Sequence, residues 1–214
     1  MTTVIFVRHG QSESNLAKVF TGQNEVSLTA LGREQAQNTA QFLKDYPIDA
    51  IYSSDLSRAV ETAEPTARMH GLEICPCEGL REVFAGEWEG RPYAELEERY
   101  AESYGKWIND MGHACPDGGE SVLHLYDRVT ETVDRLVERH RGGCIALFSH
   151  ATPTRAMGCR WFNVPPEQMS QIKRIPNASV SVAEYRDDGS IHVLLYGYDE
   201  HQGDASTSLP QGLG

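Results

Sequence analysis

The chain of 214 residues has no long hydrophobic run. No apolar stretch approaches the ~20 residues that a membrane-spanning helix needs. The start of the sequence also lacks a basic segment followed by an apolar signal core, because the run from Val4 to Val7 is too short. We therefore expect a cytoplasmic location and no membrane partner.

Cysteine is scarce and irregularly spaced. The five cysteines are Cys75, Cys77, Cys115, Cys144 and Cys159. Their number is odd, and Cys75-Pro76-Cys77 is not the C-x-x-C pattern of a redox or zinc site. The sequence favours free thiols in a reducing compartment.

Positive charge is also in short supply. Lys and Arg number 19 against 31 Asp and Glu, which gives a net charge of −12. Such an acidic chain is not expected to bind nucleic acid or anionic membranes. If its substrate is an anion, the protein must concentrate positive charge locally.

Internal repeats and a second domain boundary are missing as well. The sequence therefore indicates a single domain over residues 1–198. A helical insertion rich in Tyr, Trp and Met is expected at about 91–115, and composition indicates a mobile tail over 199–214. The insertion could pack on its own apolar face, cover a site, or do both.

What the sequence does contain is two apolar strands that each end in a histidine. Val4–Val7 leads into Arg8-His9-Gly10, and residues 144–149 lead into His150. The carboxyl ends of buried strands in α/β folds are where ligands bind. The planar guanidinium of Arg8, with its several N–H donors, suits a phosphate or carboxylate, and His9 could be a nucleophile, acid, base or metal ligand. A lone histidine at a strand end is more often structural, so a functional site is indicated only by the two strands together.

Further elements follow from periodicity and capping signals. One helix is expected over 29–46 with Thr29 as its N-cap, and a second is expected to begin after Ser54 and Asp55, which would cap it. A third helix is expected over about 122–141. Strands are expected at 48–53 and 72–77, and a hairpin at 179–185 and 190–196 around an Asp-Gly turn. Arg58 falls in the first turn of the second helix. An arginine there is unfavourable for the helix dipole, so an anionic partner would explain it.

The motif Arg-His-Gly-x-Ser-x-x-Asn at residues 8–15 resembles the signature of the histidine phosphatase superfamily, in its phosphoglycerate-mutase-like branch. Three further segments match in the family's order. They are Ser-Ser-Asp-Leu-x-Arg-Ala-x-x-Thr-Ala at 53–63, Leu-x-Glu with Gly-x-Trp-Glu-Gly at 80–90, and the segment after His150. Ser12 and Ser14 stand where the acid-phosphatase and phytase branch has Arg and Pro, which disfavours that branch.

The resemblance implies an α/β fold, a three-layer sandwich with a mostly parallel central sheet, helices on both faces and a helical cap insertion. It also implies a metal-independent phosphoryl site without cofactor. In that site His9 is the nucleophile, Glu82 the proton donor and acceptor, and Arg8, Arg58 and His150 clamp the phosphoryl oxygens. Substrate-binding positions implied by the resemblance are Asn15, Thr21, Gly22 and Ala151. Both histidines must reach one phosphate, so their strands are expected to be neighbours.

The segment after His150 departs from the family pattern. Ala151-Thr152-Pro153 replaces the usual glycines, and Pro153 has no N–H to offer a phosphate. We expect this to affect substrate choice more than chemistry. Glu87 and Glu89 are expected to be solvated.

These features favour hydrolysis of a small phosphomonoester whose leaving group is apolar or aromatic. The alternatives are a phosphoglycerate mutase-type transfer and a non-catalytic phosphate-binding domain. The insertion lacks the arginine pair that cofactor-dependent mutases carry there, which counts against the mutase. The physiological substrate and the oligomeric state stay open, with a homodimer as one option.

Overall fold

The computed structural model describes residues 1–207 and is built on one six-stranded sheet. The strand order is β3-β2-β4-β1-β5-β6. β1 to β4 run parallel, whereas β5 is antiparallel to β1 and β6 to β5. The bounds are β1 Thr2–Arg8, β2 Ala50–Ser53, β3 Ile74–Pro76, β4 Cys144–Ser149, β5 Val180–Tyr185 and β6 Ile191–Tyr198. β1 and β4 are neighbours, as predicted, and Arg8 lies opposite Ser149.

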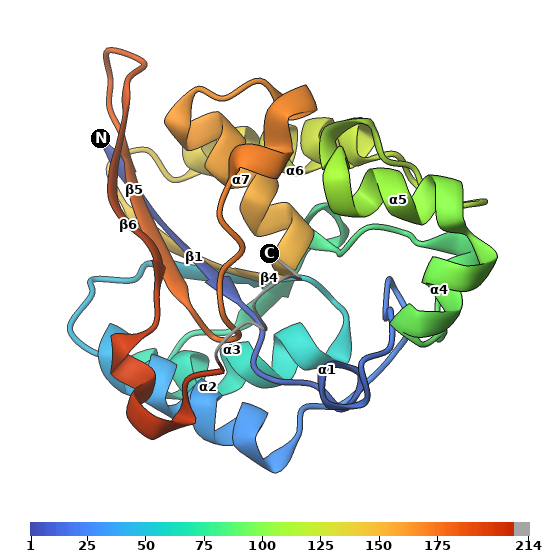
Figure 1. Cartoon of the computed structure of the whole chain (residues 1–214). Helices are drawn as coiled ribbons and strands as arrows, with labels where there is room; N and C mark the ends of the chain where they lie inside the picture. Colours follow the sequence, from blue (N-terminus) through green and yellow to red (C-terminus); the bar gives the residue numbers. More distant parts are fainter. Residues whose placement is uncertain (208–214) are drawn as a thin grey trace.

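Helices cover both faces of the sheet, which confirms the expected three-layer α/β fold (Figure 1). α2 and α3 pack together below the sheet in this view, and α6 and α7 lie above it. The bounds are α1 Glu13–Ala17, α2 Ala30–Leu43, α3 Ser57–His70, α4 Tyr93–Arg99, α5 Ala101–Asn109, α6 Val122–Arg139 and α7 Ala151–Phe162. Short 3-10 turns occupy Glu78–Leu80, Gly86–Trp88, Met111–His113, Pro166–Gln171 (η4) and Glu200–Ala205 (η5).

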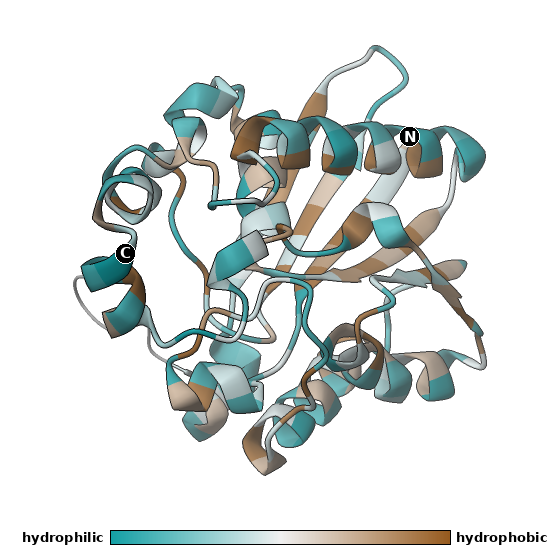
Figure 2. Cartoon of the chain, turned by 90° about the vertical axis from the view of Figure 1, so that its right-hand side faces the viewer, coloured by the Kyte–Doolittle hydropathy of each residue, from teal (hydrophilic) through white to brown (hydrophobic). Residues whose placement is uncertain are grey.

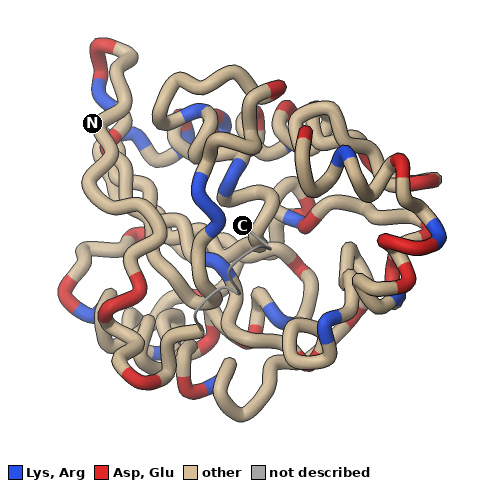
Figure 3. The backbone as a smooth tube through the Cα atoms, in the orientation of Figure 1, with Lys and Arg blue, Asp and Glu red and all other residues tan. Residues whose placement is uncertain are grey.

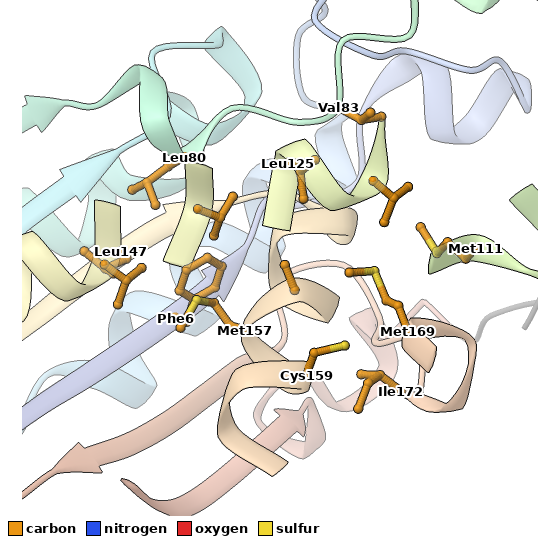
Figure 4. Close-up of a cluster of buried hydrophobic side chains, with 14 of the residues drawn as sticks. Phe6, Leu80, Val83, Met111, Leu125, Leu147, Met157, Cys159, Met169 and Ile172 are labelled. Carbon is orange, nitrogen blue, oxygen red and sulfur yellow. The ribbon is translucent and has the colours of Figure 1, made fainter. Parts of the chain in front are cut away.

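Successive side chains of the central strands point to opposite faces of the sheet, and this produces two hydrophobic cores, one on each face. In β1, Val4 and Phe6 join the core under α6 and α7, whereas Ile5 and Val7 join the core over α2 and α3. Figure 2 shows the apolar strands lying between helices whose outer sides are hydrophilic. The larger core continues from Phe6 past α7 to Met111 in the insertion (Figure 4). It therefore ties the insertion to the sheet.

The start of α2 agrees with its predicted cap, and the start of α3 does not. Thr29 accepts a backbone N–H bond at the start of α2, and Ser121, for which no cap was predicted, does the same at the start of α6. The prediction that Ser54 and Asp55 cap the next helix was wrong, because α3 begins after Leu56 without a side-chain cap. Both side chains have other partners, since Ser54 contacts His150 and Asp55 pairs with Arg81.

The C-terminal segment is more ordered than its composition indicates. η5 packs on α2, and the buried Gln202 side chain donates from Nε2 to Gln35 O, Thr39 Oγ1 and Ala178 O. The mobile tail expected from residue 199 is therefore incorrect up to Thr207, because these hydrogen bonds and the burial of Ala205 hold the segment. Residues 208–214 lie outside the described part of the chain.

The expected insertion consists of α4, α5 and a 3-10 turn, and it lies beside the carboxyl edge of the sheet (Figure 1). Its entry is hydrogen-bonded to the loop after α1, where Phe20 N–H donates to Arg91 O and Gly90 N–H donates to Phe20 O. Over residues 1–207, no helix is long and apolar enough to cross a membrane.

Candidate active site

The predicted site residues converge at the carboxyl edge of β1 and β4. Eight of the nine line one cavity of about 500 Å³: Arg8, His9, Asn15, Thr21, Gly22, Arg58, Glu82 and Ala151. His150 is the ninth, and its ring centroid lies 5.2 Å from that of His9. The volume is within the range of about 300–1,000 Å³ that is typical of small-molecule sites.

His9 is held in one tautomer. Its Nδ1 lies 2.7 Å from Gly10 O, so Nδ1–H donates to that carbonyl and Nε2 keeps its lone pair. Burial, followed by the charges of Arg58 and Arg8, lowers the pKa of His9 well below its usual value. The ring is therefore neutral at physiological pH, as a nitrogen nucleophile requires.

His150 is oriented by Ser54. Its Nε2 lies 2.8 Å from Ser54 Oγ, which also accepts the Leu56 N–H at 3.3 Å. The Ser54 hydroxyl can thus donate to Nε2, which places the ring proton of neutral His150 on Nδ1. Nδ1 is buried and has no partner within residues 1–207. Burial first, and Arg58 second, lowers the pKa of His150 well below the ordinary value.

Arg8 and Arg58 flank His9 as fixed positive charges. Arg8 Nη1 donates to Ile175 O, and its Nε is buried and unpartnered among the described residues. Arg58, in the first turn of α3 as predicted, donates to Gly22 O at 2.8 Å and Asn24 O at 3.0 Å. Burial lowers the pKa of each guanidinium to about 10, so both remain charged at neutral pH.

Glu82 is attached to the start of α7. Its Oε2 accepts the Thr152 N–H at 3.3 Å, and its Oε1 accepts the Val83 N–H at 2.9 Å. The Ala-Thr-Pro departure fits this arrangement, because Pro153 lies in the first turn of α7, where no intrahelical N–H bond is lost. Ala151 is the first residue of α7, so its N–H has no intrahelical acceptor, and the residue lines the cavity.

The Ser12-x-x-Asn15 spacing of the first motif has a structural reason. Ser12 Oγ accepts the Asn15 N–H, and Asn15 Oδ1 accepts the Ser12 N–H, which is a capping box for α1. Asn177 Nδ2 also donates to Asn15 Oδ1 at 3.1 Å. The Asn15 oxygen is thus held, and its NH₂ group remains as the donor for a ligand.

The Thr21-Gly22 loop is braced by an acid that the sequence analysis placed in solvent. Glu89 Oε1 accepts N–H bonds from Gln23 at 2.8 Å and Ala85 at 3.1 Å, so the expectation for Glu89 was wrong. Gly22 has a φ of 56°, and a Cβ there would collide with the Glu89 carboxylate. Glu87 is exposed, as expected, and accepts from Tyr100 OH.

The apolar and aromatic side chains of the insertion both pack against the rest of the fold and line the site, the two roles that the sequence allowed. Phe20, Trp88 and Trp107 pack edge-to-face at 5.2–6.0 Å between ring centroids. Trp107 also lines the cavity, together with Tyr93, Tyr104, Ile108 and Met111. The insertion is therefore a packed element and a wall of the site.

Several cavity residues were missed by the sequence analysis, namely Lys18, Arg155, Arg174 and Asn177. Arg155 lies in α7 four positions after Ala151, and this helical spacing places both residues on the same face, toward the site. Arg174 lies in an irregular segment between η4 and β5, and its sequence carries no signal for the site.

A neutral buried histidine with two arginines in the same cavity, at the carboxyl edge of a mostly parallel sheet, is an arrangement suited to a phosphate-type anion next to a ring nitrogen that keeps its lone pair. Comparison with known proteins gives the family. The model of the histidine phosphatase superfamily (branch 1) matches residues 4–197, and the chain belongs to that superfamily.

Individual relatives resemble the chain over nearly its whole length. "Phosphoglycerate mutase-like protein 4" of Arabidopsis thaliana is 32% identical over 92% of this chain and 86% of its own. "Phosphoserine phosphatase 1" of Hydrogenobacter thermophilus is 33% identical over 91% of this chain and 92% of its own. Among solved structures, Bacillus stearothermophilus YhfR superposes with a TM-score of 0.89 at 26% identity, covering 94% of this chain and 99% of that one.

Proposed function

We propose that the chain is a metal-independent phosphatase that hydrolyses a small phosphomonoester through a phosphohistidine on His9. The observation that carries the proposal is the fixed neutral tautomer of His9, whose Nδ1–H donates to Gly10 O while Arg8 and Arg58 lie beside the ring. Its phosphatase relatives support hydrolysis at the level of the superfamily.

In the first step, His9 Nε2 attacks phosphorus and the bond from phosphorus to the leaving oxygen breaks. Glu82, entering protonated, gives its proton to that oxygen. Arg8, Arg58 and the Nδ1–H of His150 stabilise the charge on the equatorial oxygens of the phosphoryl group. The Ala151 amide adds a donor from the helix N-terminus.

In the second step, water attacks the phosphohistidine and the nitrogen–phosphorus bond breaks. The Glu82 carboxylate takes the proton of the attacking water, which restores its starting form. His9 returns to the neutral tautomer held by Gly10 O, so the cycle closes without any other group.

The proposal is tested by phosphate release from sugar phosphates, phosphoglycerates, nucleotides and an aryl phosphate, with EDTA present. Wild type is compared with His9→Ala and with His192→Ala, a histidine on the exposed side of β6. We expect release by wild type and His192→Ala, no release by His9→Ala, and an acid-labile phosphoenzyme in quenched wild-type reactions.

Two results would redirect the proposal. Transfer between phosphoglycerates without phosphate release would show a mutase, which is the activity named in the mutase-like relatives. Phosphate binding without release or transfer from any ester would show a binding domain.

A further inference from the structure

The cavity holds more positive charge than one phosphoryl group needs. Among its described lining residues Glu82 is the one carboxylate, whereas five side chains are cationic: Arg8, Lys18, Arg58, Arg155 and Arg174. A phosphomonoester group brings about two negative charges at neutral pH. In a chain of net charge −12, this surplus is a local feature, and Figure 3 shows several basic segments near the middle of the view with acidic ones mostly outside.

Besides Lys18, the surplus charge comes from two arginines that are not part of the phosphoryl clamp. Arg155 comes from α7 and Arg174 from the segment after η4. Their charges affect each other, since Arg174 lowers the pKa of Arg155, after burial as the larger cause. Arg174 lines the same cavity as Tyr93 and Tyr104 of the insertion. In the proposed reaction the phosphoryl group binds in its clamp, and we place the leaving group on the side of these two arginines.

Arg155 supplies a fixed charge in this pair. It is only 5% exposed, and its guanidinium donates to Met111 Sδ at 2.7 Å and Met169 O at 2.8 Å. Its Nε is buried without a partner among residues 1–207, and no acidic side chain there forms an ion pair with it. A buried cation without an anion is costly, so an anionic ligand nearby would be favoured.

Arg174 is the reachable member of the pair. It is half-buried and lines the same cavity as Arg8 and His9. Because Arg8 and Arg174 line one cavity, a single ligand with two anionic groups could contact both of them. Trp107, Ile108 and Met111 line the same cavity and give an apolar contact for the intervening atoms.

We propose that Arg174 and Arg155 form a second anion subsite, and that the preferred substrates are phosphomonoesters whose leaving group carries its own anionic group. The inference rests on the proposed function for the placement of the leaving group. It narrows the substrate class to phosphomonoesters whose leaving group carries a second anionic group. Leaving groups that carry an ammonium group in its place are disfavoured.

The test uses matched ester pairs that differ only in the second charge: phenyl phosphate against carboxyphenyl phosphate, and glycerol phosphate against phosphoglycerate. The variant is Arg174→Gln, with Arg174→Lys as the charge-keeping version. Lys173→Gln is the control, because it removes one positive charge from the neighbouring exposed position, outside the cavity lining.

We expect wild type to prefer the carboxylated ester of each pair in kcat/KM. Arg174→Gln should lower that preference by about 10- to 100-fold, mainly through KM, because a charged hydrogen bond is lost. Arg174→Lys should retain part of the preference, and Lys173→Gln should keep all of it. An unchanged preference in Arg174→Gln, or no preference in wild type, would overturn the subsite.

Binding separates this inference from the proposed function. Calorimetric titration of His9→Ala with the same esters requires no turnover. Tighter binding of the carboxylated esters that disappears in His9→Ala/Arg174→Gln supports the subsite even if wild type hydrolyses nothing. Equal binding of both members of each pair rejects it even if wild type is an active phosphatase.

Discussion

His9 and His150 are buried beside arginines, and this makes the stability of the fold depend on pH. Both folded-state pKa values lie below the value near 6.5 of an unfolded histidine. Below pH 6.5 the unfolded chain therefore binds protons that the folded chain does not. The contribution of the two neutral histidines to the free energy of unfolding is fully present above pH 6.5, and it is lost as the pH falls toward their folded-state pKa values.

We predict that His9→Asn flattens the acid loss of stability by up to about 1.4 kcal/mol per pH unit, the slope that one titrating histidine gives. The measurement is urea unfolding between pH 6.5 and 5 in buffers free of phosphate and sulfate, which would occupy the site. His192→Asn, in the exposed position on β6, should keep the wild-type slope. Identical slopes for His9→Asn and wild type would contradict the assignment of a depressed pKa to His9.

Ser54 is predicted to be a positioning residue that acts through His150. Ser54→Ala removes the hydroxyl next to Nε2, so the ring loses its fixed tautomer and kcat/KM should fall about tenfold. Ser53→Ala is the matched control, because that buried hydroxyl donates to the Ser54 carbonyl and not to a histidine. A structural role alone would leave the pH profile of kcat/KM unchanged, whereas loss of the His150 contact should alter it.

At the scale of elements, the joint between β1 and α2 depends on two glycines in contact. A Cβ on Gly10 would lie 2.5 Å from Gly32 O, and a Cβ on Gly32 would lie 2.0 Å from Gln11 O. The first motif thus requires Gly10 for the approach of α2, and not only for the approach of a ligand. Through this contact α2 supports the backbone that carries His9.

We predict that Gly32→Ala lowers the free energy of unfolding by about 2 kcal/mol, because backbone must move to admit the methyl group. Gly105→Ala, inside α5, has nothing within 4 Å of the added Cβ and should raise that free energy by about 0.5–1 kcal/mol. Urea unfolding of both variants measures the contrast. Equal effects of the two substitutions would show that the close approach is not a constraint.

Elements with a strong local pattern could be predicted from sequence, and convergent charges could not. β1 and β4 were identified because buried apolar runs end in Arg-His or Ser-His, and α6 because its stripe recurs at helical spacing. Ser54 was misread because a serine before a helix is typical of an N-cap, whereas tertiary packing gives its hydroxyl to His150. Arg155 and Arg174 were missed because a lone arginine usually lies in solvent, and only the packing of α7 against the segment after η4 brings these two together.

At the scale of the whole molecule, the C-terminal segment closes the fold around the site. Gln202 reaches Ala178, and Ala178 N–H donates to His9 O at 3.1 Å. Asn177 Nδ2 donates to the same carbonyl, and Thr207 Oγ1 accepts the Asn177 N–H. Composition could not show this, because a polar segment is held here by specific long-range hydrogen bonds and not by an apolar stripe.

We therefore predict that Gln202→Ala lowers the free energy of unfolding by about 1–3 kcal/mol, because buried acceptors on α2 and at Ala178 lose the Gln202 amide as a donor. Gln171→Ala is the control, since that exposed side chain donates to the exposed Gln168 and its loss should change the free energy of unfolding by no more than about 0.5 kcal/mol. Urea unfolding measures the difference, and phosphate release measures the connection to the site. If both variants unfold alike, the segment is a loosely attached tail, as its composition alone indicates, and His9 owes its position to β1, β4 and α2 without help from the C-terminus.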